Sequence, residues 1–390
     1  MFLNKVTIKN LWDKKPTEIN FDKKVTILTG VNGSGKSSIL NIIYDSLSIG
    51  SSSKVISTSK SRMWVSKCEL SNGINIQNIL LSPLPDSKKE HVSTLMTDFL
   101  NSKDYTSFLS DSFTDKIMSI YTEIPYKTHV FFTKRNNDES ISHGKISSFE
   151  IPDGMSTEDG EVLIQTLASK SNAFIFQEDR RTLHDISKSN IDPTISFWKT
   201  YSSSIDQRFY YIRDAMHIKE SIIDSERSKL IDLYNDEDGI NFDKLTNDPA
   251  YKENNNSRKE ISKIYSLLNT YFNKTGKEIT KDQEDHKITL KMKDSEETLS
   301  WHLLSRGEKT LIYLFFAIYL YRDKVEIFLL DEPEISLHVQ WQEHLLKDLT
   351  DVSPNSQFIV TTHSPHLVMN GWMTNCLTVN LFGGEKNVSN

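Results

Sequence analysis

Apolar and polar residues alternate along several short segments in the first part of the chain. A period of two places successive side chains on opposite faces of a β-strand, so each segment is expected to form a strand with one buried face. Asn72-Gly73 lies between two of these segments and is a strong signal for a β-hairpin. The region is therefore expected to contain an antiparallel sheet. The segments are 2–8, 18–21, 64–70, 74–81, 129–134 and 145–151.

Other short runs are almost entirely apolar and end in polar residues. Such strands are buried on both faces, which is typical of a parallel sheet covered by helices. Helical periodicity follows the first run at residues 39–43 and returns at 311–321, a stretch too short to cross a membrane and expected to be a buried helix. Strands that alternate with helices predict an α/β fold. The runs are 25–28, 174–176, 327–330 and 357–362.

The character of the chain changes between about residues 196 and 285. This part is rich in Lys, Glu, Ile, Leu and Tyr and is broken at 236–239 and at Asp248-Pro249, which predicts two or three helices inserted into the α/β host. A helix of about 35 residues would project roughly 50 Å. The stretch has no long heptad repeat, so an extended coiled-coil arm is not expected. Strand patterning resumes at 287–292 and 298–301.

Residues 30–37 read Gly-Val-Asn-Gly-Ser-Gly-Lys-Ser and join the first apolar run to a helical stretch, which is the context of a phosphate-binding P-loop. Glycines let backbone N–H groups turn toward phosphate oxygens, and the helix adds the positive end of its dipole. Lys36 is expected to reach the β- and γ-phosphates of ATP, and Ser37 to bind Mg²⁺. The residues expected to hold the nucleotide here are Asn32, Gly33, Ser34, Gly35, Lys36, Ser37 and Ser38.

Two carboxylates, Asp331 and Glu332, follow the apolar run 327–330. The carboxyl ends of parallel strands form the ligand-binding edge of an α/β sheet. Asp331 is expected to hold Mg²⁺ through water, and Glu332 to activate the water that attacks the γ-phosphate. An acidic pair can also be the polar end of an ordinary strand, but the P-loop in the same chain favours this Walker B interpretation.

Composition narrows the class of protein. The chain has 390 residues, 37% of them hydrophobic, which is enough for two or three structural units. The net charge of −7 gives no overall attraction to nucleic acid or to an anionic membrane. The two cysteines, Cys68 and Cys376, lie far apart, which argues against a disulfide framework or a zinc site. With no secretory signal at the N-terminus, a reducing cytoplasmic location is expected.

Residues 304–309 read Leu-Ser-Arg-Gly-Glu-Lys and precede a predicted helix. Ser305 and Glu308 have the spacing of a capping box. The same stretch, shortly before the Asp-Glu strand, resembles the signature motif of the ATP-binding-cassette superfamily, and the two interpretations are compatible. The resemblance implies that Ser305, Gly307 and Glu308 bind the ATP held by a second subunit, at a helix N-terminus suited to anions.

Two further residues take their roles from this resemblance. His363 follows the strand after the Asp-Glu pair, where cassette ATPases carry a switch histidine that contacts the γ-phosphate. The alternative is a turn residue before Pro365. Gln177 follows the run 174–176 and is a candidate Q-loop residue, expected to contact Mg²⁺ and to couple the helical insertion to the nucleotide.

Residues 331–338 read Asp-Glu-Pro-Glu-Ile-Ser-Leu-His, which resembles stand-alone cassette ATPases of the RecF, structural-maintenance-of-chromosomes and overcoming-lysogenization-defect group. Transporter cassettes usually have aspartate where His338 stands. The resemblance implies an α/β P-loop NTPase of the cassette type, with a mixed central sheet, an antiparallel β subdomain and an inserted helical domain. The expected units are lobe I over 1–195, the helical insertion over 196–285 and lobe II over 286–390.

Many members of this group serve anti-phage systems of the Septu, PARIS and retron-associated kinds and work with a nuclease or toxin. The resemblance therefore implies a sensor or scaffold ATPase that uses ATP and Mg²⁺ and controls a separate effector. Its heads would sandwich ATP in a homodimer or a higher even-numbered homo-oligomer, without a membrane partner. Fewer than thirty residues follow His363, too few for the Toprim nuclease of the overcoming-lysogenization-defect proteins, so no intrinsic nuclease is expected.

Two other functions compete with this one. A DNA repair or recombination ATPase, whose closed heads clamp DNA, is supported by the RecF-like architecture. It is opposed by the acidic net charge, because duplex binding needs Lys and Arg to displace counterions. The nucleotide-binding subunit of a transporter is disfavoured by the helical insertion and by His338.

Overall fold

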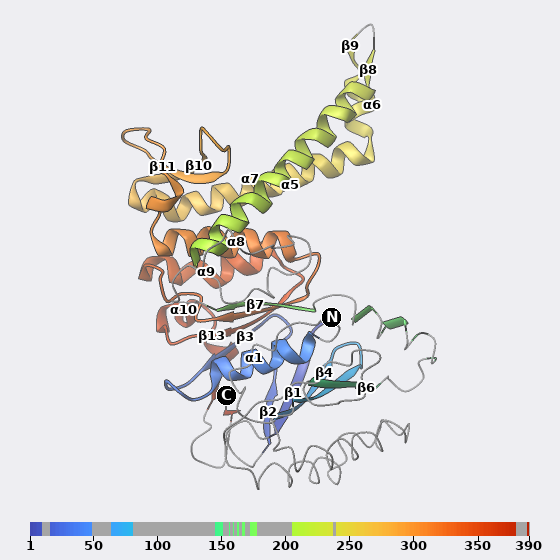
Figure 1. Ribbon diagram of the computed structural model, residues 1–390, viewed down its shortest axis with the longest axis vertical. Helices are drawn as coiled ribbons and strands as arrows, with labels where there is room; N and C mark the ends of the chain where they lie inside the picture. Colours follow the sequence, from blue (N-terminus) through green and yellow to red (C-terminus); the bar gives the residue numbers. More distant parts are fainter. Residues whose placement is uncertain are drawn as a thin grey trace, which may run out of the picture.

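The computed structural model describes residues 1–9, 16–48, 64–80, 145–150, 172–177, 205–236, 239–379 and 388–389, with isolated positions between 156 and 167. Two β-sheets and the helices that cover them form one body, from which a pair of long helices extends (Figure 1). The strand expected at 129–134 lies outside the described residues.

The first sheet is antiparallel and has the strand order β2-β1-β4-β5-β6. Its alternating pattern buries Val6 and Ile8 of β1 on one face, and a shift of register between Leu3 and Lys5 lets Leu3 join the same core. Strands β4 and β5 pair across Asn72-Gly73, where Gly73 has a φ of 84°, a value that glycine adopts without strain. The predicted hairpin is therefore confirmed. The strands are β1 (Leu3–Lys9), β2 (Thr17–Asn20), β4 (Trp64–Leu70), β5 (Asn75–Leu80) and β6 (Lys145–Glu150).

The second sheet has the order β15-β14-β3-β13-β12-β7 and is parallel from β14 to β7, while β15 pairs antiparallel with β14. Its central strands are buried at nearly every position, as their apolar sequences predict. The strands are β3 (Val25–Thr29), β7 (Ala173–Gln177), β12 (Ile327–Asp331), β13 (Gln357–Thr361), β14 (Cys376–Val379) and β15 (Val388–Ser389).

Each face of the second sheet belongs to a different core. Helix α1 (Lys36–Leu47) lies between the two sheets and packs with Leu329 and Ile359 (Figure 1). Helices α8 (Arg306–Tyr321) and α9 (Val339–Val352) cover the opposite face, where Phe328 and Val360 point. Together the mixed sheet, the antiparallel sheet and these helices confirm the predicted α/β fold class, with a mixed central sheet and an antiparallel β subdomain.

The projecting pair consists of α5 (Ile205–Leu233) and α7 (Pro249–Phe272). Near the sheets, Phe209, Ile212 and Leu268 are buried in the core that contains α8. At the far end the chain turns through β8 (Asn235–Asp236), β9 (Gly239–Ile240) and α6 (Phe242–Asn247), where Leu233 is 71% exposed. The Asp248-Pro249 break starts α7, because the Asp248 side chain accepts hydrogen bonds from the N–H groups of Ala250 and Tyr251.

A hairpin of β10 (Lys277–Lys281) and β11 (Ile288–Met292) follows α7. Strand β11 confirms the strand expected at 287–292. Strand β10 lies within the stretch whose pattern was assigned to helices. The helical region ends before it because Gly276, with a φ of 70°, provides a left-handed C-terminal cap.

The strand expected at 298–301 is wrong. Thr298 makes only an isolated bridge with Lys291, and Trp301–Leu303 form a short 3₁₀ turn. The indole ring of Trp301 lies against the cationic groups of Arg213 and Lys309, 5.7 and 5.6 Å from the ring centre, which favours a turn toward α5 and α8 over an extended strand. None of the described helices has the length and apolar content that crossing a bilayer requires.

Candidate functional site

The central sheet brings the predicted site residues to one edge. In the register of β12, Asp331 lies opposite Gln177 of β7 on one side and opposite Thr361 of β13 on the other. Thr361 in turn lies opposite Leu28 of β3, the strand that leads into the P-loop. The P-loop, the carboxylates of Asp331 and Glu332, and the loop that carries His363 therefore leave the sheet at the same carboxyl edge, where α/β proteins bind ligands.

The P-loop backbone has the form of an anion site. Gly33 and Gly35 have φ values of 81° and 91°, which side chains other than glycine rarely adopt. At Gly30 a Cβ atom would lie 2.6 Å from the carbonyl oxygen of Val379, so the close approach of β14 also requires glycine. Among the described residues, no side chain caps the N-terminus of α1, as is suitable for a helix end that binds a phosphate.

Lys36 is 4% exposed and points back over this loop. Its Nζ donates hydrogen bonds to the carbonyl oxygens of Gly30 at 3.1 Å and Val31 at 3.2 Å, and lies 2.9 Å from Nε2 of His363. Burial lowers the pKa of Lys36, while the nearby Glu332 and Asp331 oppose this shift. A buried ammonium group beside a helix N-terminus without a side-chain cap fits a triphosphate.

Ser37 and Asp331 meet directly. The Ser37 hydroxyl donates to Oδ1 of Asp331 at 2.9 Å, and the Thr361 hydroxyl donates to the same oxygen. Burial raises the pKa of Asp331, and these two hydrogen bonds act in the opposite direction. The described residues contain no cluster of three His, Cys, Asp or Glu side chains for a metal. One carboxylate with a hydroxyl suits Mg²⁺ that is held mainly by phosphate and water.

Glu332 is held in an unusual conformation beside His363. Its φ is 48°, in the left-handed region that non-glycine residues avoid and that is enriched at functional sites. Its N–H donates to the carbonyl oxygen of Thr361 at 3.0 Å, which fixes this turn at the end of β12. Oε1 of Glu332 lies 3.4 Å from Nε2 of His363. Lys36, Glu332 and His363 therefore converge on one point.

Gln177 reaches the edge of the same site from β7. Its side-chain amide donates to Oδ1 of Asn41 on α1, and its backbone carbonyl accepts a hydrogen bond from Arg208 of α5. Gln177 thus contacts both the P-loop helix and the projecting helical pair. Its side chain makes no hydrogen bond to Asp331 among the contacts described.

The remaining P-loop residues surround the same loop. Asn32 and Gly33 are exposed, whereas Ser34 and Ser38 are buried. Within the described structure, the Ser34 hydroxyl oxygen is buried without a hydrogen-bond partner. A polar atom of this kind normally has a partner, so it is a further group suited to a bound ligand.

The signature residues lie elsewhere. Ser305 caps α8: its hydroxyl accepts from the N–H of Glu308 at 3.3 Å, and Glu308 accepts from the N–H of Ser305 at 2.7 Å, which confirms the predicted capping box. Gly307 packs so closely on the loop after β12 that a Cβ atom would lie 2.5 Å from the carbonyl oxygen of Ser336. In the described parts of the chain, none of the hydrogen-bond partners of Ser305, Gly307 and Glu308 belongs to the P-loop.

Sequence reasoning missed the hydroxyl and amide groups that hold the loop after β12 and the loop after β13 together. Thr362 donates to Glu334, and Ser364 donates to Oε1 of Gln342, whose Nε2 in turn donates to the backbone carbonyl of Glu334 at 3.3 Å. Burial raises the pKa of Glu334 to about 7. The hydroxyl residues on both sides of His363, Thr361, Thr362 and Ser364, were the signal for these contacts in the sequence.

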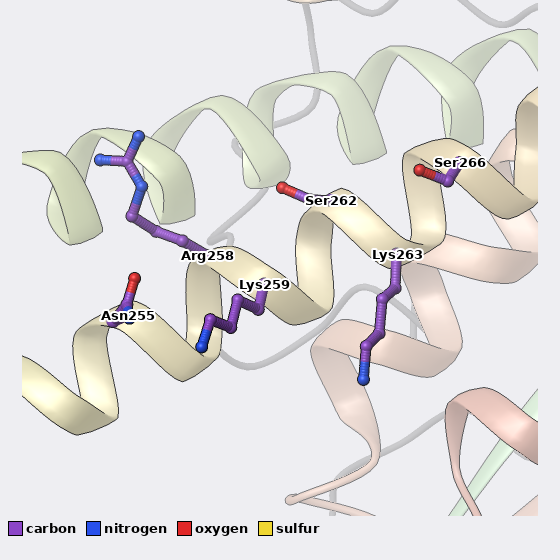
Figure 2. Close-up of a pocket in the computed structure, with 6 residues that line it drawn as sticks. All are labelled: Asn255, Arg258, Lys259, Ser262, Lys263 and Ser266. Atoms are coloured by element: carbon purple, nitrogen blue, oxygen red, sulfur yellow. The ribbon is translucent and has the colours of Figure 1, made fainter.

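One surface groove lies away from this edge. It has a volume of about 520 Å³ and runs along α7 (Figure 2). Arg258 extends toward α5, where it pairs with Asp224 at 2.9 Å, while Lys259 and Lys263 extend to the opposite side. None of the residues that line the groove belongs to the candidate site at the sheet edge. Its lining residues are Asn255, Arg258, Lys259, Ser262, Lys263 and Ser266.

Residues 1–368 match the model of one protein family, described as the AAA ATPase domain. The chain belongs to this family. The match spans the P-loop, the signature stretch, the Walker B carboxylates and His363, so the ATPase class predicted from the sequence is confirmed.

Curated relatives of the chain carry names from retron and Septu systems. The "Retron Vc95 probable ATPase" of Vibrio cholerae is 24% identical over 397 aligned residues, covering 93% of this chain and 71% of that protein. The "Septu protein PtuA" of Bacillus thuringiensis is 35% identical over 78 residues, 17% of this chain and 20% of that protein. "Endonuclease GajA" of Bacillus cereus is 40% identical over 75 residues, 19% of this chain but only 13% of that protein. These relatives confirm the predicted resemblance.

Among solved structures, the head of a structural-maintenance-of-chromosomes protein bound to the winged-helix domain of ScpA aligns with 100% of this chain and 98% of that one. The sequence identity is 16% and the TM-score is 0.48.

Proposed function

We propose that the chain binds Mg²⁺-ATP at the carboxyl edge of the central sheet and hydrolyses it. The observation that carries this proposal is the contact of three side chains beside the P-loop. Nε2 of His363 lies 2.9 Å from Nζ of Lys36 and 3.4 Å from Oε1 of Glu332. A cation, an imidazole and a carboxylate at one point suit a γ-phosphate and an attacking water.

Each residue has a separate task in this proposal. Lys36 and the first N–H groups of α1 bind the phosphates, and Ser37 and Asp331 hold Mg²⁺. Glu332 orients and polarises the attacking water. The left-handed backbone conformation of Glu332 would keep its carboxylate directed toward the phosphate. His363 contacts the γ-phosphate. Gln177 links the state of the site to α5 through the bond between its carbonyl and Arg208.

The signature residues act on a second copy of the chain. Ser305 and Arg306 are exposed at the N-terminus of α8, and the hydrogen bonds described for Ser305 join it to Glu308 of the same helix. A helix N-terminus that faces outward can meet the nucleotide of another subunit. The protein would therefore form a homodimer, or a higher even-numbered assembly, with ATP between the heads.

The wider role is that of a sensor or scaffold ATPase in an anti-phage system, with ATP binding controlling a separate nuclease or toxin. The retron and Septu names of the relatives support this context, although the chain spans less than a quarter of the Septu and GajA proteins. The chain itself would have no nuclease activity and would work in the cytoplasm.

The proposed structural units of the chain are lobe I over 1–195, the helical insertion over 196–285 and lobe II over 286–390.

The Glu332→Gln variant tests the proposed shared site, in which the P-loop of one chain and the signature stretch of a second chain bind the same ATP. Removing the carboxylate that polarises water should lower the rate of ATP hydrolysis about 100-fold or more while leaving nucleotide binding intact. The variant should then accumulate as an ATP-bound dimer. Light scattering with saturating Mg²⁺-ATP measures this, with ADP as the control nucleotide. A variant that stays monomeric with ATP would contradict the shared site.

One observation favours the DNA-clamping alternative. Lys259 and Lys263 are exposed one helical turn apart on the same side of α7, where a phosphate backbone could contact both (Figure 2). If this groove binds DNA, duplex DNA should stimulate ATP hydrolysis at low salt, and Lys259→Glu with Lys263→Glu should abolish the stimulation. The absence of any stimulation at low salt would remove this alternative.

A further inference from the structure

An ion pair ties the β10–β11 hairpin to the first turn of α8. Nζ of Lys277 lies 2.7 Å from Oε1 of Glu308, whose side chain is only 4% exposed. The other carboxylate oxygen, Oε2, accepts the N–H of Ser305 at 2.7 Å. Each oxygen of this buried carboxylate therefore has a partner, and the cation comes from a residue that precedes the signature stretch by almost thirty positions.

This carboxylate poses an electrostatic problem for the site. The N-terminus of a helix carries roughly half a positive charge, which a full negative charge in the same turn outweighs. This buried charge would repel an incoming triphosphate, and the repulsion grows as water is excluded from an interface. Arg306 in the same turn is also cationic, but it is exposed to solvent, whereas Lys277 contacts the carboxylate directly. Lys309, the next residue of α8, does not offset the charge, because its ammonium group is bound to Asp206 at 2.6 Å and to the carbonyl of His302 at 3.3 Å.

We infer that Lys277 is a positioning residue of the signature site, which neutralises Glu308 so that the first turn of α8 accepts the nucleotide of a second copy. The inference rests on the proposed shared site and deepens it. Glu308 is needed to hold the N–H of Ser305 in the capping box, and Lys277 removes the electrostatic penalty of that carboxylate. Through Lys277, the β10–β11 hairpin therefore contributes a charge to the proposed nucleotide site.

The test uses the full chain in the Glu332→Gln background, where ATP drives dimer formation. Lys277→Met should raise the ATP concentration needed for the dimer by about tenfold or more, because it leaves a buried carboxylate unpaired. Lys277→Arg, which keeps the charge, should dimerise as the background does. Adding Glu308→Gln to Lys277→Met should restore the dimer, since glutamine still accepts the Ser305 N–H but carries no charge.

Two controls separate a charge effect from a loss of structure. Lys291→Met removes another lysine of the same hairpin, one that pairs with Glu278 at 2.9 Å on its surface, and should leave the dimer unchanged. Binding of a fluorescent ATP analogue to the monomer should be the same in every variant, because Lys277 does not touch the P-loop of its own chain.

The outcomes distinguish the two proposals. If the Glu332→Gln protein without further changes does not dimerise with ATP, both the shared site and this inference are wrong. If the Glu332→Gln protein dimerises and adding Lys277→Met does not change this, only the role of Lys277 is wrong. Loss of the dimer in Lys277→Met without recovery on adding Glu308→Gln also overturns it, because the hairpin would then act through structure and not through charge.

Discussion

Three side chains from three separate elements meet at Nε2 of His363. Lys36 comes from the start of α1, Glu332 from the turn after β12 and His363 from the loop after β13. The left-handed φ of Glu332 costs free energy, of the order of 1 kcal/mol, so the surrounding hydrogen bonds must hold it in place. Thr361 supplies one of these bonds and also binds Asp331, which makes it the residue that aligns both carboxylates.

Glu334 gives the site a pH-dependent stability. Burial raises its pKa from 4.5 in the unfolded chain to about 7 in the folded protein. The folded state therefore binds more protons than the unfolded state between these values, and the free energy of unfolding falls as the pH rises through this window. Glu334→Gln removes the effect, so relative to the wild type it should gain about 2 kcal/mol of stability between pH 5.5 and pH 8.

Urea denaturation of both proteins at the two pH values measures this difference. The exposed Glu284 provides the matched control, and Glu284→Gln should track the wild type at both pH values. If the stability of Glu334→Gln shifts with pH in parallel with the wild type, Glu334 is ionised in the folded protein at pH 5.5 and the expectation is wrong.

At the scale of elements, motifs with a fixed spacing were predictable and tertiary contacts were not. The P-loop, the hairpin at Asn72-Gly73 and the capping box at Ser305 depend on residues close in the sequence, and the structure has all three. Strand β10 was missed because the loop 282–287 that joins it to β11 has no Asn-Gly or Asp-Gly signal. The contact of its first residue, Lys277, with Glu308 was missed because the two residues lie far apart in the sequence. The roles assigned to Gln177 and His363 came from a resemblance and remain predictions.

The close contact between α8 and the loop after β12 predicts a cost for any side chain at position 307. A Cβ atom there would lie 2.5 Å from the backbone oxygen of Ser336, and a backbone atom cannot move aside as a flexible side chain can. Helix propensity alone favours alanine over glycine by about 1 kcal/mol. We expect the clash to win, so that Gly307→Ala lowers the free energy of unfolding by about 1–3 kcal/mol.

Urea denaturation again provides the measurement. Gln340→Ala places alanine at an exposed position at the start of α9, near the same loop, and should change stability by less than about 0.5 kcal/mol. A Gly307→Ala protein that is as stable as the wild type, or more stable, would mean that α8 and the loop can separate at little cost.

At the scale of the whole molecule, α5 touches both parts of the proposed shared site. Arg208 donates a hydrogen bond to the backbone carbonyl of Gln177 beside the P-loop. Asp206 accepts one from Lys309, the fourth residue of α8, the helix that begins with the signature stretch. These two contacts lie within one helical turn at the base of the projecting pair, α5 and α7 (Figure 1). If ATP moves α8 relative to the P-loop, as the proposed function requires, these two contacts predict that the pair α5 and α7 tilts with it.

A shared site predicts that two inactive variants can restore each other. Lys36→Ala removes the phosphate-binding cation from one chain, and Ser305→Arg blocks the signature turn that the other chain would supply. In a mixed dimer one site combines an intact P-loop with an intact signature turn, while the other site has both defects. At equal concentrations half of the dimers are mixed and each has one intact site, so about a quarter of the wild-type ATPase activity should return. Each variant alone provides the control, and mixtures no more active than these would show that each chain hydrolyses ATP with its own residues.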